Sequence, residues 1–374
     1  MRIGVTGADG FLGWHMRAHL KTLSSEEVLC ARRKTFLDDE LLDAFVDGCD
    51  AIVHAAGVNR SADDSEIRDV NIALATKLAE SIARTGSAPV VVFANSTHSD
   101  GDSVFGKAKA EAAKILGDVC ASSGGAFVDV ILPHLFGEYG RPFYNSGVHT
   151  FAHQIVTGET PEILHDGEVN LLHAQQAARL ITGHLRDTSS SQLRPEGVRM
   201  RASEALARLR HLAGPYLERG DIPEVDERID LELFNVLRSN MYPDRYPIPL
   251  TVHGDARGGF FEVLRANGQG QTSISTTVPG ITRGEHYHLD KIERFVVVSG
   301  EATISMRQLF TDTVTTYRVN GAEPVAIDMP PLTTHNIVNV GEGELVTLFW
   351  SNDHFDPDNP DTYPEPVAPP TAGV

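Results

Sequence analysis

The sequence predicts a doubly wound α/β domain built on a parallel sheet, followed by an all-β barrel. Two changes of pattern predict this order. From residue 1 to about 185, short apolar runs alternate with longer helix-favouring stretches, and from Leu250 onward short β-branched runs are separated by Gly and Asp turns. Strands that alternate with helices form a parallel sheet covered on both faces, whereas short strands with frequent turns are typical of barrels.

The chain has 374 residues, which is enough for two domains. Strands of the first domain are expected at residues 3–5, 28–30, 51–54, 90–93 and 128–132, and helices at 72–84 and 108–120. A proline-rich segment, residues 242–249, is expected to link the domains. We therefore expect a first domain over residues 1–245, with a small substrate subdomain, a barrel over 246–356, and a proline-rich tail over 357–374 that wraps the surface or is partly disordered.

A glycine-rich loop follows the first expected strand and opens a helix. Gly7 permits the tight turn, Gly10 lets the backbone approach a pyrophosphate, and Gly13 allows close packing of the helix on the strand. The N–H groups of the helix N-terminus attract phosphate oxygens. The loop therefore predicts a dinucleotide site, and its expected cofactor contacts are Gly7, Asp9, Gly10, Phe11, Leu12 and Gly13.

The residues after the second expected strand indicate which dinucleotide is bound. A carboxylate at this place usually binds the ribose hydroxyls of NAD. This chain instead has Arg32, Arg33 and Lys34. Cations favour a 2′-phosphate, so we expect NADP(H) bound by Arg32 and Arg33, with a solvated basic turn as the alternative.

His286, His288, Glu293 and His335 are the candidate metal ligands. Side chains i and i+2 of a strand share a face, so the two neighbouring histidines should project together. Glu293 opens the next apolar run, which is expected to return past them. Three imidazoles and one carboxylate predict a divalent metal site, with zinc as the metal that we expect, although iron, manganese and nickel accept the same ligands. A pair of surface histidines on a β-hairpin is the alternative.

The composition limits the partners and the location. A formal net charge of -19 argues against nucleic acid, whose binding draws on clustered Lys and Arg. No apolar run approaches the roughly 18 residues that span a bilayer, and the strand pattern that begins at Met1 leaves no room for a signal peptide. Three unpatterned cysteines suit reduced thiols, so we expect a cytoplasmic protein.

The N-terminal residues resemble the extended short-chain dehydrogenase/reductase (SDR) family, which has a Rossmann fold. Besides the glycine-rich loop, the resemblance rests on His54-Ala55-Ala56-Gly57, Asn71 and Ser96-Thr97. It implies cofactor contacts by Ala55, Ala56 and Lys109, and catalytic roles for Ser96, Thr97 and Lys109.

The catalytic Tyr-x-x-x-Lys of that family is incomplete in this chain. Lys109 holds the lysine position, but Phe105 stands where the family has the tyrosine. In the family, the phenol gives a proton to the carbonyl oxygen as hydride arrives, and such general acid catalysis contributes about 10²–10⁴-fold. We therefore expect slow hydride transfer, or another donor among Ser96, Thr97, His98 and a water held by Lys109.

The C-terminal residues resemble the cupin family of small β-barrels. The resemblance rests on the histidine frame between Gly280 and Gly300 and on Pro330-Pro331-Leu332-Thr333-Thr334-His335, and it implies that the four candidate ligands hold the metal. The family usually has Gly at the position of Leu332. We expect this leucine to alter the geometry of the loop without loss of a ligand.

The whole chain resembles the bifunctional enzymes of capsular polysaccharide synthesis that make UDP-N-acetyl-L-fucosamine precursors. The shared motifs are Gly4-Val5-Thr6-Gly7-Ala8-Asp9-Gly10-Phe11-Leu12-Gly13, Ala56-Gly57-Val58-Asn59-Arg60, Arg141-Pro142-Phe143-Tyr144-Asn145-Ser146 and Gly280-Ile281-Thr282-Arg283-Gly284-Glu285-His286-Tyr287-His288. The resemblance implies that the zinc cupin epimerises a UDP-2-acetamido-2,6-dideoxy-4-hexulose at C3, and that the N-terminal domain reduces its ketone with NADPH. Arg141, Tyr144 and Asn145 are candidates for binding the UDP-sugar, with a plain structural turn as the alternative.

The sequence therefore predicts a metal-dependent C3-epimerase of a UDP-linked 4-keto sugar, whose reductase step is in question because of Phe105. One alternative is a fully bifunctional enzyme with another proton donor. A second is an NADP-sensing regulatory or interaction protein, and a third is a cupin dioxygenase or isomerase acting on an unrelated small molecule. The expected partners are the UDP-sugar and a second copy of the chain in a homodimer, without nucleic acid or membrane.

Overall fold

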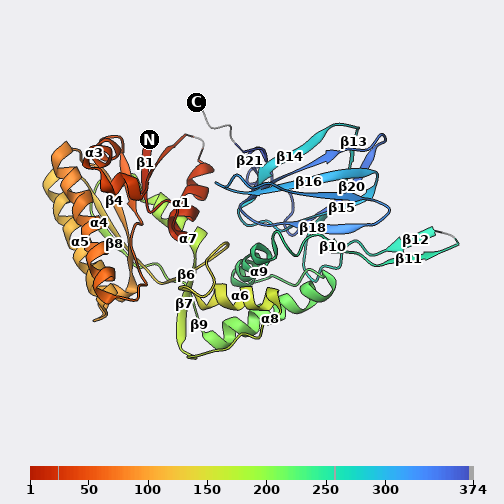
Figure 1. Cartoon of the computed structure of the whole chain (residues 1–374), viewed down its shortest axis with the longest axis horizontal. Helices are drawn as coiled ribbons and strands as arrows, with labels where there is room; N and C mark the ends of the chain where they lie inside the picture. The colour runs from red at the N-terminus through yellow and green to blue at the C-terminus, as the bar shows by residue number, and fades with distance from the viewer. Residues whose placement is uncertain (24, 257, 370–374) are drawn as a thin grey trace. The chain divides into compact units, whose positions relative to one another are not determined.

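The structure is a computed structural model that describes residues 1–23, 25–256 and 258–369 (Figure 1). The chain divides into two compact units, the first made of Met1–Ser146 and Gly167–Arg201, the second of Gly147–Asp166 and Ala202–Val374. These boundaries differ from the ranges 1–245 and 246–356, because three helices that precede residue 245 belong to the same unit as the barrel. The expected domain ranges stay a prediction.

A six-stranded parallel sheet with the order β2-β1-β3-β4-β5-β8 forms the centre of the first unit. Its strands are β1 (Arg2–Thr6), β2 (Glu27–Ala31), β3 (Ala51–His54), β4 (Val90–Ser96), β5 (Phe127–Leu132) and β8 (Ser191–Leu193). The chain changes sides of β1 between β2 and β3, and ligands of such sheets bind beyond the carboxyl ends of the strands at this switch point. The doubly wound prediction is confirmed.

Helices cover both faces of this sheet (Figure 1). Helices α1 (Phe11–Lys21) and α7 (Ala174–Gly183) bury side chains such as Met16 and Ile181 on one face. Helices α3 (Asp39–Asp47), α4 (Asp64–Thr85) and α5 (Val104–Ser123) cover the other with side chains such as Leu78 and Leu116. The shorter elements of this unit are α2 (Arg33–Leu37), η1 (Thr97–Asp100), and the three-stranded sheet of β6 (His134–Phe136), β7 (Glu168–His173) and β9 (Val198–Arg201).

The second unit contains the predicted cupin barrel, built from two five-stranded antiparallel sheets. One sheet is β17 (Thr315–Asn320), β16 (Glu301–Gln308), β19 (Thr333–Asn339), β14 (Thr282–Tyr287) and β21 (Tyr363–Pro364). The other is β10 (Ile248–Pro249), β18 (Val325–Met329), β15 (Glu293–Ser299), β20 (Leu345–Ser351) and β13 (Gln271–Thr277). Inward side chains of the two sheets, such as Phe295, Ile304 and Ile337, form one apolar core.

Among its described residues, the same unit also holds a separate hairpin and three helices. The hairpin pairs β11 (Val252–Asp255) with β12 (Gly258–Phe261), and the helices are α6 (Gly147–Thr157), α8 (Ala202–Arg219) and α9 (Arg228–Met241). No helix in the described part of the chain is long and apolar enough to cross a membrane.

A buried polar network fixes α8 to the barrel. Arg294 donates two hydrogen bonds to the carboxylate of Asp328, at 2.6 and 2.8 Å. Tyr216 of α8 donates to the same carboxylate at 2.6 Å, and its oxygen lies 3.0 Å from the hydroxyl of Tyr246. The segment 242–249, expected to link two domains, therefore lies inside the second unit, where Tyr246 is buried and Ile248 pairs with β18.

The proline-rich tail joins the barrel. Strand β21 pairs with β14 through Tyr363 and Tyr287, and Val367 is buried. The expectation that this tail wraps the surface or is partly disordered stays a prediction, and residues 370–374 lie outside the described residues.

Candidate functional site

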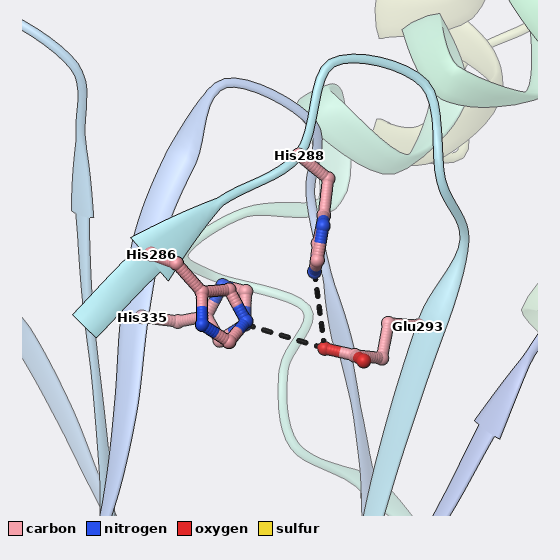
Figure 2. Close-up of side chains that lie close together, drawn as sticks. All are labelled: His286, His288, Glu293 and His335. Atoms are coloured by element: carbon pink, nitrogen blue, oxygen red, sulfur yellow. Dashed lines mark hydrogen bonds and ion pairs between the residues drawn. The ribbon is translucent and has the colours of Figure 1, made fainter. Parts of the chain in front are cut away.

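The four predicted metal ligands meet at one end of the barrel. Figure 2 shows the three imidazoles and the Glu293 carboxylate pointing toward one another. His286 lies in β14 and His335 in β19 of one sheet, and His288 directly follows β14. Glu293 begins β15 of the opposite sheet. One ligand atom from each residue lies within 4.8 Å of all the others.

A glycine bulge sets the register of this site. Antiparallel pairing of β14 with β19 places His286 opposite His335, and the register shifts between Gly284 and His286. Gly284 has a φ of +96°, and a Cβ there would lie 2.8 Å from the carbonyl oxygen of His335. The bulge thus requires glycine. Tyr287, which lies between the two ligand histidines in the sequence, points away from the ligands and packs on Tyr363.

The hydrogen bonds of two histidines fit a bound cation. His288 Nδ1 lies 2.6 Å from the carbonyl oxygen of Asp361, and His335 Nδ1 lies 3.3 Å from that of Thr333. A nitrogen that donates to a carbonyl carries the hydrogen, so Nε2 of each neutral imidazole presents a lone pair. Both Nε2 atoms face Oε2 of Glu293, at 3.2 and 3.3 Å. Acceptors this close repel one another unless a cation lies between them.

The spacing and the burial of these groups agree with that fit. Donors held about 2.1 Å from a tetrahedral zinc ion lie about 3.4 Å apart. Burial lowers the pKa of His286 to about 3, and burial also lowers the pKa of His335, so both imidazoles are neutral at physiological pH. Neutral imidazoles and an ionised carboxylate are the states that bind a metal.

Leu332 keeps a left-handed turn before the last ligand. Its φ is +57°, a conformation that glycine adopts at no steric cost, and its side chain is fully buried. The Leu332 N–H donates to the carbonyl of His288 at 2.8 Å, which ties the turn to the ligand strand. His335 remains in the cluster, as expected. The turn before it keeps a left-handed conformation despite the leucine.

In the first unit, the glycine-rich loop is packed as the sequence predicts. Gly7 has a φ of +64°, and a Cβ there would lie 2.8 Å from the backbone of Ala56. A Cβ on Gly13 would lie 2.1 Å from the carbonyl oxygen of Gly7. Gly10 is the N-cap of α1, and it has no side chain that could bond the first N–H groups of the helix. Because α1 begins just after β1 ends, these N–H groups lie at the carboxyl edge of the sheet.

Arg32 lies beside this loop. Its Nε donates to Asp9 at 2.9 Å, and Arg17 donates to the other oxygen of Asp9 at 3.1 Å. Arg33, the first residue of α2, is exposed. Of the predicted cofactor-binding cations, Arg32 is therefore placed next to the turn that follows β1.

The segment after β3 is held against the loop by buried polar side chains. Thr6 accepts a hydrogen bond from the Ala56 N–H at 3.1 Å, and its hydroxyl lies 2.9 Å from His54 Nδ1. Asn71 donates to the carbonyls of Val58 and Ile67 at 2.6 Å each. Ala56 thus lies beside Gly7, at the switch point of the sheet.

The predicted catalytic residues of the first unit lie around the N-terminus of α5. Ser96 ends β4 and Thr97 opens η1, while Phe105 and Lys109 are one turn apart on α5. Lys109 Nζ donates to the Ala94 carbonyl at 2.6 Å. The His98 ring, one residue beyond Thr97, lies 6.0 Å from the Phe105 ring. An imidazole therefore neighbours the position where the family has its phenol.

Lys109 should give the protein a measurable pH dependence of stability. Burial lowers the pKa of Lys109 to about 7, and Asp129 opposes the shift. Lysine in an unfolded chain has a pKa of ~10.4, so between about pH 7 and 10 the unfolded chain binds a proton that the folded protein has released. The wild-type free energy of unfolding should therefore rise relative to that of Lys109→Met across this window. Urea denaturation at each pH measures it, and parallel curves would contradict it.

The candidate sugar-binding residues lie on the loop after β6. Arg141 is exposed and its guanidinium lies 5.2 Å from the centre of the Tyr144 ring. Asn145 is exposed, and Arg60 donates a short hydrogen bond to the carbonyl of Tyr144. That bond joins segments 56–60 and 141–146, two of the motifs that this chain shares with the capsular polysaccharide enzymes.

Sequence reasoning missed the residues that support the metal ligands. The loop between His288 and Glu293 is bonded by Asp361 of the tail, Asn352, and Asn235 of α9. These side chains come from distant parts of the chain and follow no periodic pattern. Asp361 is one of several acidic residues in the proline-rich tail, and no sequence pattern distinguishes it from Asp358 or Glu365.

Comparison with known proteins gives matches to both parts of the chain. Residues 3–192 match the model of the NAD dependent epimerase/dehydratase family, and residues 253–363 match a polysaccharide biosynthesis C-terminal domain. A UDP-2-acetamido-2,6-beta-L-arabino-hexul-4-ose reductase of Pseudomonas aeruginosa is 30% identical over 368 residues, which cover 97% of this chain and 98% of that protein. The spore coat polysaccharide biosynthesis protein SpsL of Bacillus subtilis is 27% identical over 122 residues, or 30% of this chain and 81% of that protein.

A solved structure also matches nearly end to end. The capsular polysaccharide assembling protein CapF of Staphylococcus aureus is 29% identical, with a TM-score of 0.63, and the match covers 98% of this chain and 100% of that one. The resemblance that the motifs suggested is thus found along the whole length of the chain.

Proposed function

We propose that this enzyme, which belongs to the NAD dependent epimerase/dehydratase family, epimerises a nucleotide sugar in capsular polysaccharide synthesis. The proposed substrate is a UDP-linked 2-acetamido-2,6-dideoxy-4-keto-hexose, inverted at C3 in the barrel. The name of the Pseudomonas aeruginosa relative describes a hexul-4-ose of this kind.

The observation that carries this proposal is the cluster of lone pairs in the barrel. His288 and His335 direct Nε2 at the Glu293 carboxylate. In a neutral imidazole whose Nδ1 donates to a carbonyl, as both rings are placed to do, Nε2 has no hydrogen to donate. A divalent metal held by these residues with His286, which we expect to be zinc, would polarise the sugar ketone and stabilise the enolate that forms when C3 loses its proton. Return of a proton to the opposite face of C3 completes the epimerisation.

The first unit is proposed to bind NADPH. The loop of Gly7, Gly10 and Gly13 gives the pyrophosphate access to backbone N–H groups, and Arg32 beside it offers a cation for the 2′-phosphate. The UDP-sugar would contact Arg141, Tyr144 and Asn145. We also propose that the protein is cytoplasmic and forms a homodimer.

Replacing Arg32 with alanine should weaken NADPH binding by about 10- to 100-fold, because a hydrogen bond to a charged group contributes about 1.5–3 kcal/mol. NADH has no 2′-phosphate, so its affinity should change little. Fluorescence titration with both cofactors measures the ratio. Lys34→Ala, two residues along the same exposed segment, serves as the control, and an equal loss of NADPH and NADH affinity would argue against a 2′-phosphate contact.

Reduction of the ketone is a second candidate function. A bound nicotinamide cofactor would supply hydride to C4, and the ketone oxygen would then need a proton. Phe105 has no proton to give, whereas the His98 ring lies 6.0 Å from it and is exposed. Full bifunctionality with His98 as the proton donor is therefore the reading that this contact favours.

The decisive experiment incubates the protein with the UDP-linked 4-keto sugar in D₂O and Zn²⁺, with and without NADPH, and identifies the products by NMR. Without NADPH, one deuterium should enter C3. Absence of exchange with any such sugar would reject the epimerase. With NADPH, its oxidation measures the reductase.

A further inference from the structure

The tail of the barrel contacts the metal-ligand loop directly. The loop, residues 289–292, connects His288 to Glu293, and its position sets the distance between these two ligands. Asp361 of the tail lies against it and has a φ of +41°, in the left-handed region that aspartate and asparagine tolerate better than most residues.

The Asp361 carboxylate caps three consecutive backbone N–H groups of the loop. Its Oδ1 accepts from Leu289 at 2.8 Å, and its Oδ2 accepts from Asp290 at 3.0 Å and from Lys291 at 2.9 Å. Hydrogen bonds to a charged acceptor are about twice as strong as neutral ones. One side chain therefore holds most of the loop backbone in place.

The backbone of the same residue sets the state of a ligand. The Asp361 carbonyl accepts from His288 Nδ1 at 2.6 Å. This bond keeps the hydrogen on Nδ1 and leaves Nε2 to bind, which is the arrangement found around metal-bound histidines. Asp361 thus acts on His288 through its carbonyl and on the loop through its carboxylate.

The tail is anchored on both sides of Asp361. Before it, Lys291 Nζ donates to the Pro360 carbonyl at 2.6 Å. After it, the buried Arg307 donates to the carbonyls of Pro366 and Val367 at 2.7 and 2.8 Å. Glu285, one residue before His286, accepts from the Val367 N–H at 2.6 Å. The segment 360–367 is thus tied to the ligand strand and to its loop.

We infer that Asp361 is a positioning residue for the metal site, and that the tail is a strap that holds the ligand loop and the tautomer of His288. This inference rests on the proposed metal site and extends it to a part of the chain that lies 72 residues from the loop amide it caps. The strap contacts no reacting atom, so its effect is on metal affinity and on the order of the loop.

The test compares Asp361→Asn with wild type. Asparagine tolerates the same backbone conformation, but it offers one oxygen where aspartate offers two, so it cannot cap all three N–H groups. Its Zn²⁺ affinity, measured by competition with a chromophoric chelator, should fall about 10- to 100-fold. In the metal-free protein, the amides of residues 289–291 should exchange with solvent faster than in wild type. Asp358→Asn, at an exposed aspartate of the same tail, should match wild type in both measurements.

The outcomes separate this inference from the proposed function. Wild-type affinity and exchange in Asp361→Asn, while all proteins bind Zn²⁺, would overturn the role of Asp361 and leave the metal site standing. Failure of wild type to bind Zn²⁺ would overturn both. An equal loss in Asp358→Asn would show a general effect of tail charge and would also overturn the role of Asp361.

Discussion

Replacing His286 and His288 together with alanine should abolish Zn²⁺ binding and slow solvent exchange at C3 by about 10³-fold or more. Both imidazoles are among the four groups that converge on one point, and the remaining Glu293 and His335 cannot hold the ion alone. Polarisation of a carbonyl by a metal is worth several kcal/mol, and each 1.36 kcal/mol is tenfold in rate. Zinc content by mass spectrometry of the protein and deuterium incorporation by NMR measure the two effects.

The control for this variant is His354→Ala, which removes an exposed histidine of the same unit. It should keep both zinc and exchange. Circular dichroism checks that the double variant is folded. Undiminished C3 exchange in a folded, zinc-free double variant would contradict the metal-dependent mechanism.

Replacing Phe105 with tyrosine should raise the rate of NADPH oxidation by about 10²-fold or more. Position 105 lies one turn before Lys109 on α5, the spacing at which the family pairs its phenol and lysine. A phenol there restores a proton donor, and general acid catalysis contributes about 10²–10⁴-fold. Single-turnover oxidation of NADPH with the keto sugar isolates the chemical step.

Two further variants show which group donates in the natural enzyme. Phe105→Leu changes the ring without adding a proton donor and should give no gain. His98→Ala should slow the wild-type reductase if the imidazole supplies the proton, and should matter less once Tyr is present at position 105. A Phe105→Tyr variant that is no faster than wild type would mean that the missing phenol does not limit the rate.

Much of the fold could be predicted from short patterns. The glycine-rich loop could be predicted because its turn is too tight for a Cβ, and a Cβ on Gly7 or Gly13 would indeed clash with backbone atoms. The alternation of His286 and His288 around Tyr287 needed only the two-residue period of a strand. Such patterns depend on neighbours in the sequence, so they can be recognised before any tertiary contact is known.

The division of the chain was harder to predict. The helices α6, α8 and α9 precede the proline-rich segment, so composition places them with the first domain, yet they belong to the unit of the barrel. The contacts that decide this are buried bonds such as Tyr216 to Asp328, which join residues 112 positions apart. Composition carries no record of such pairings.

The sequence by itself determined which four residues form the candidate metal site and which two folds the chain adopts, because ligand type, spacing and periodicity are local properties. Only the tertiary structure decided how those ligands are held: which ring nitrogen of His288 faces the cluster, and that Asp361 caps the loop beside it. The physical reason is that a hydrogen bond needs two groups to meet in space, and the folded chain alone brings the tail to the ligand loop.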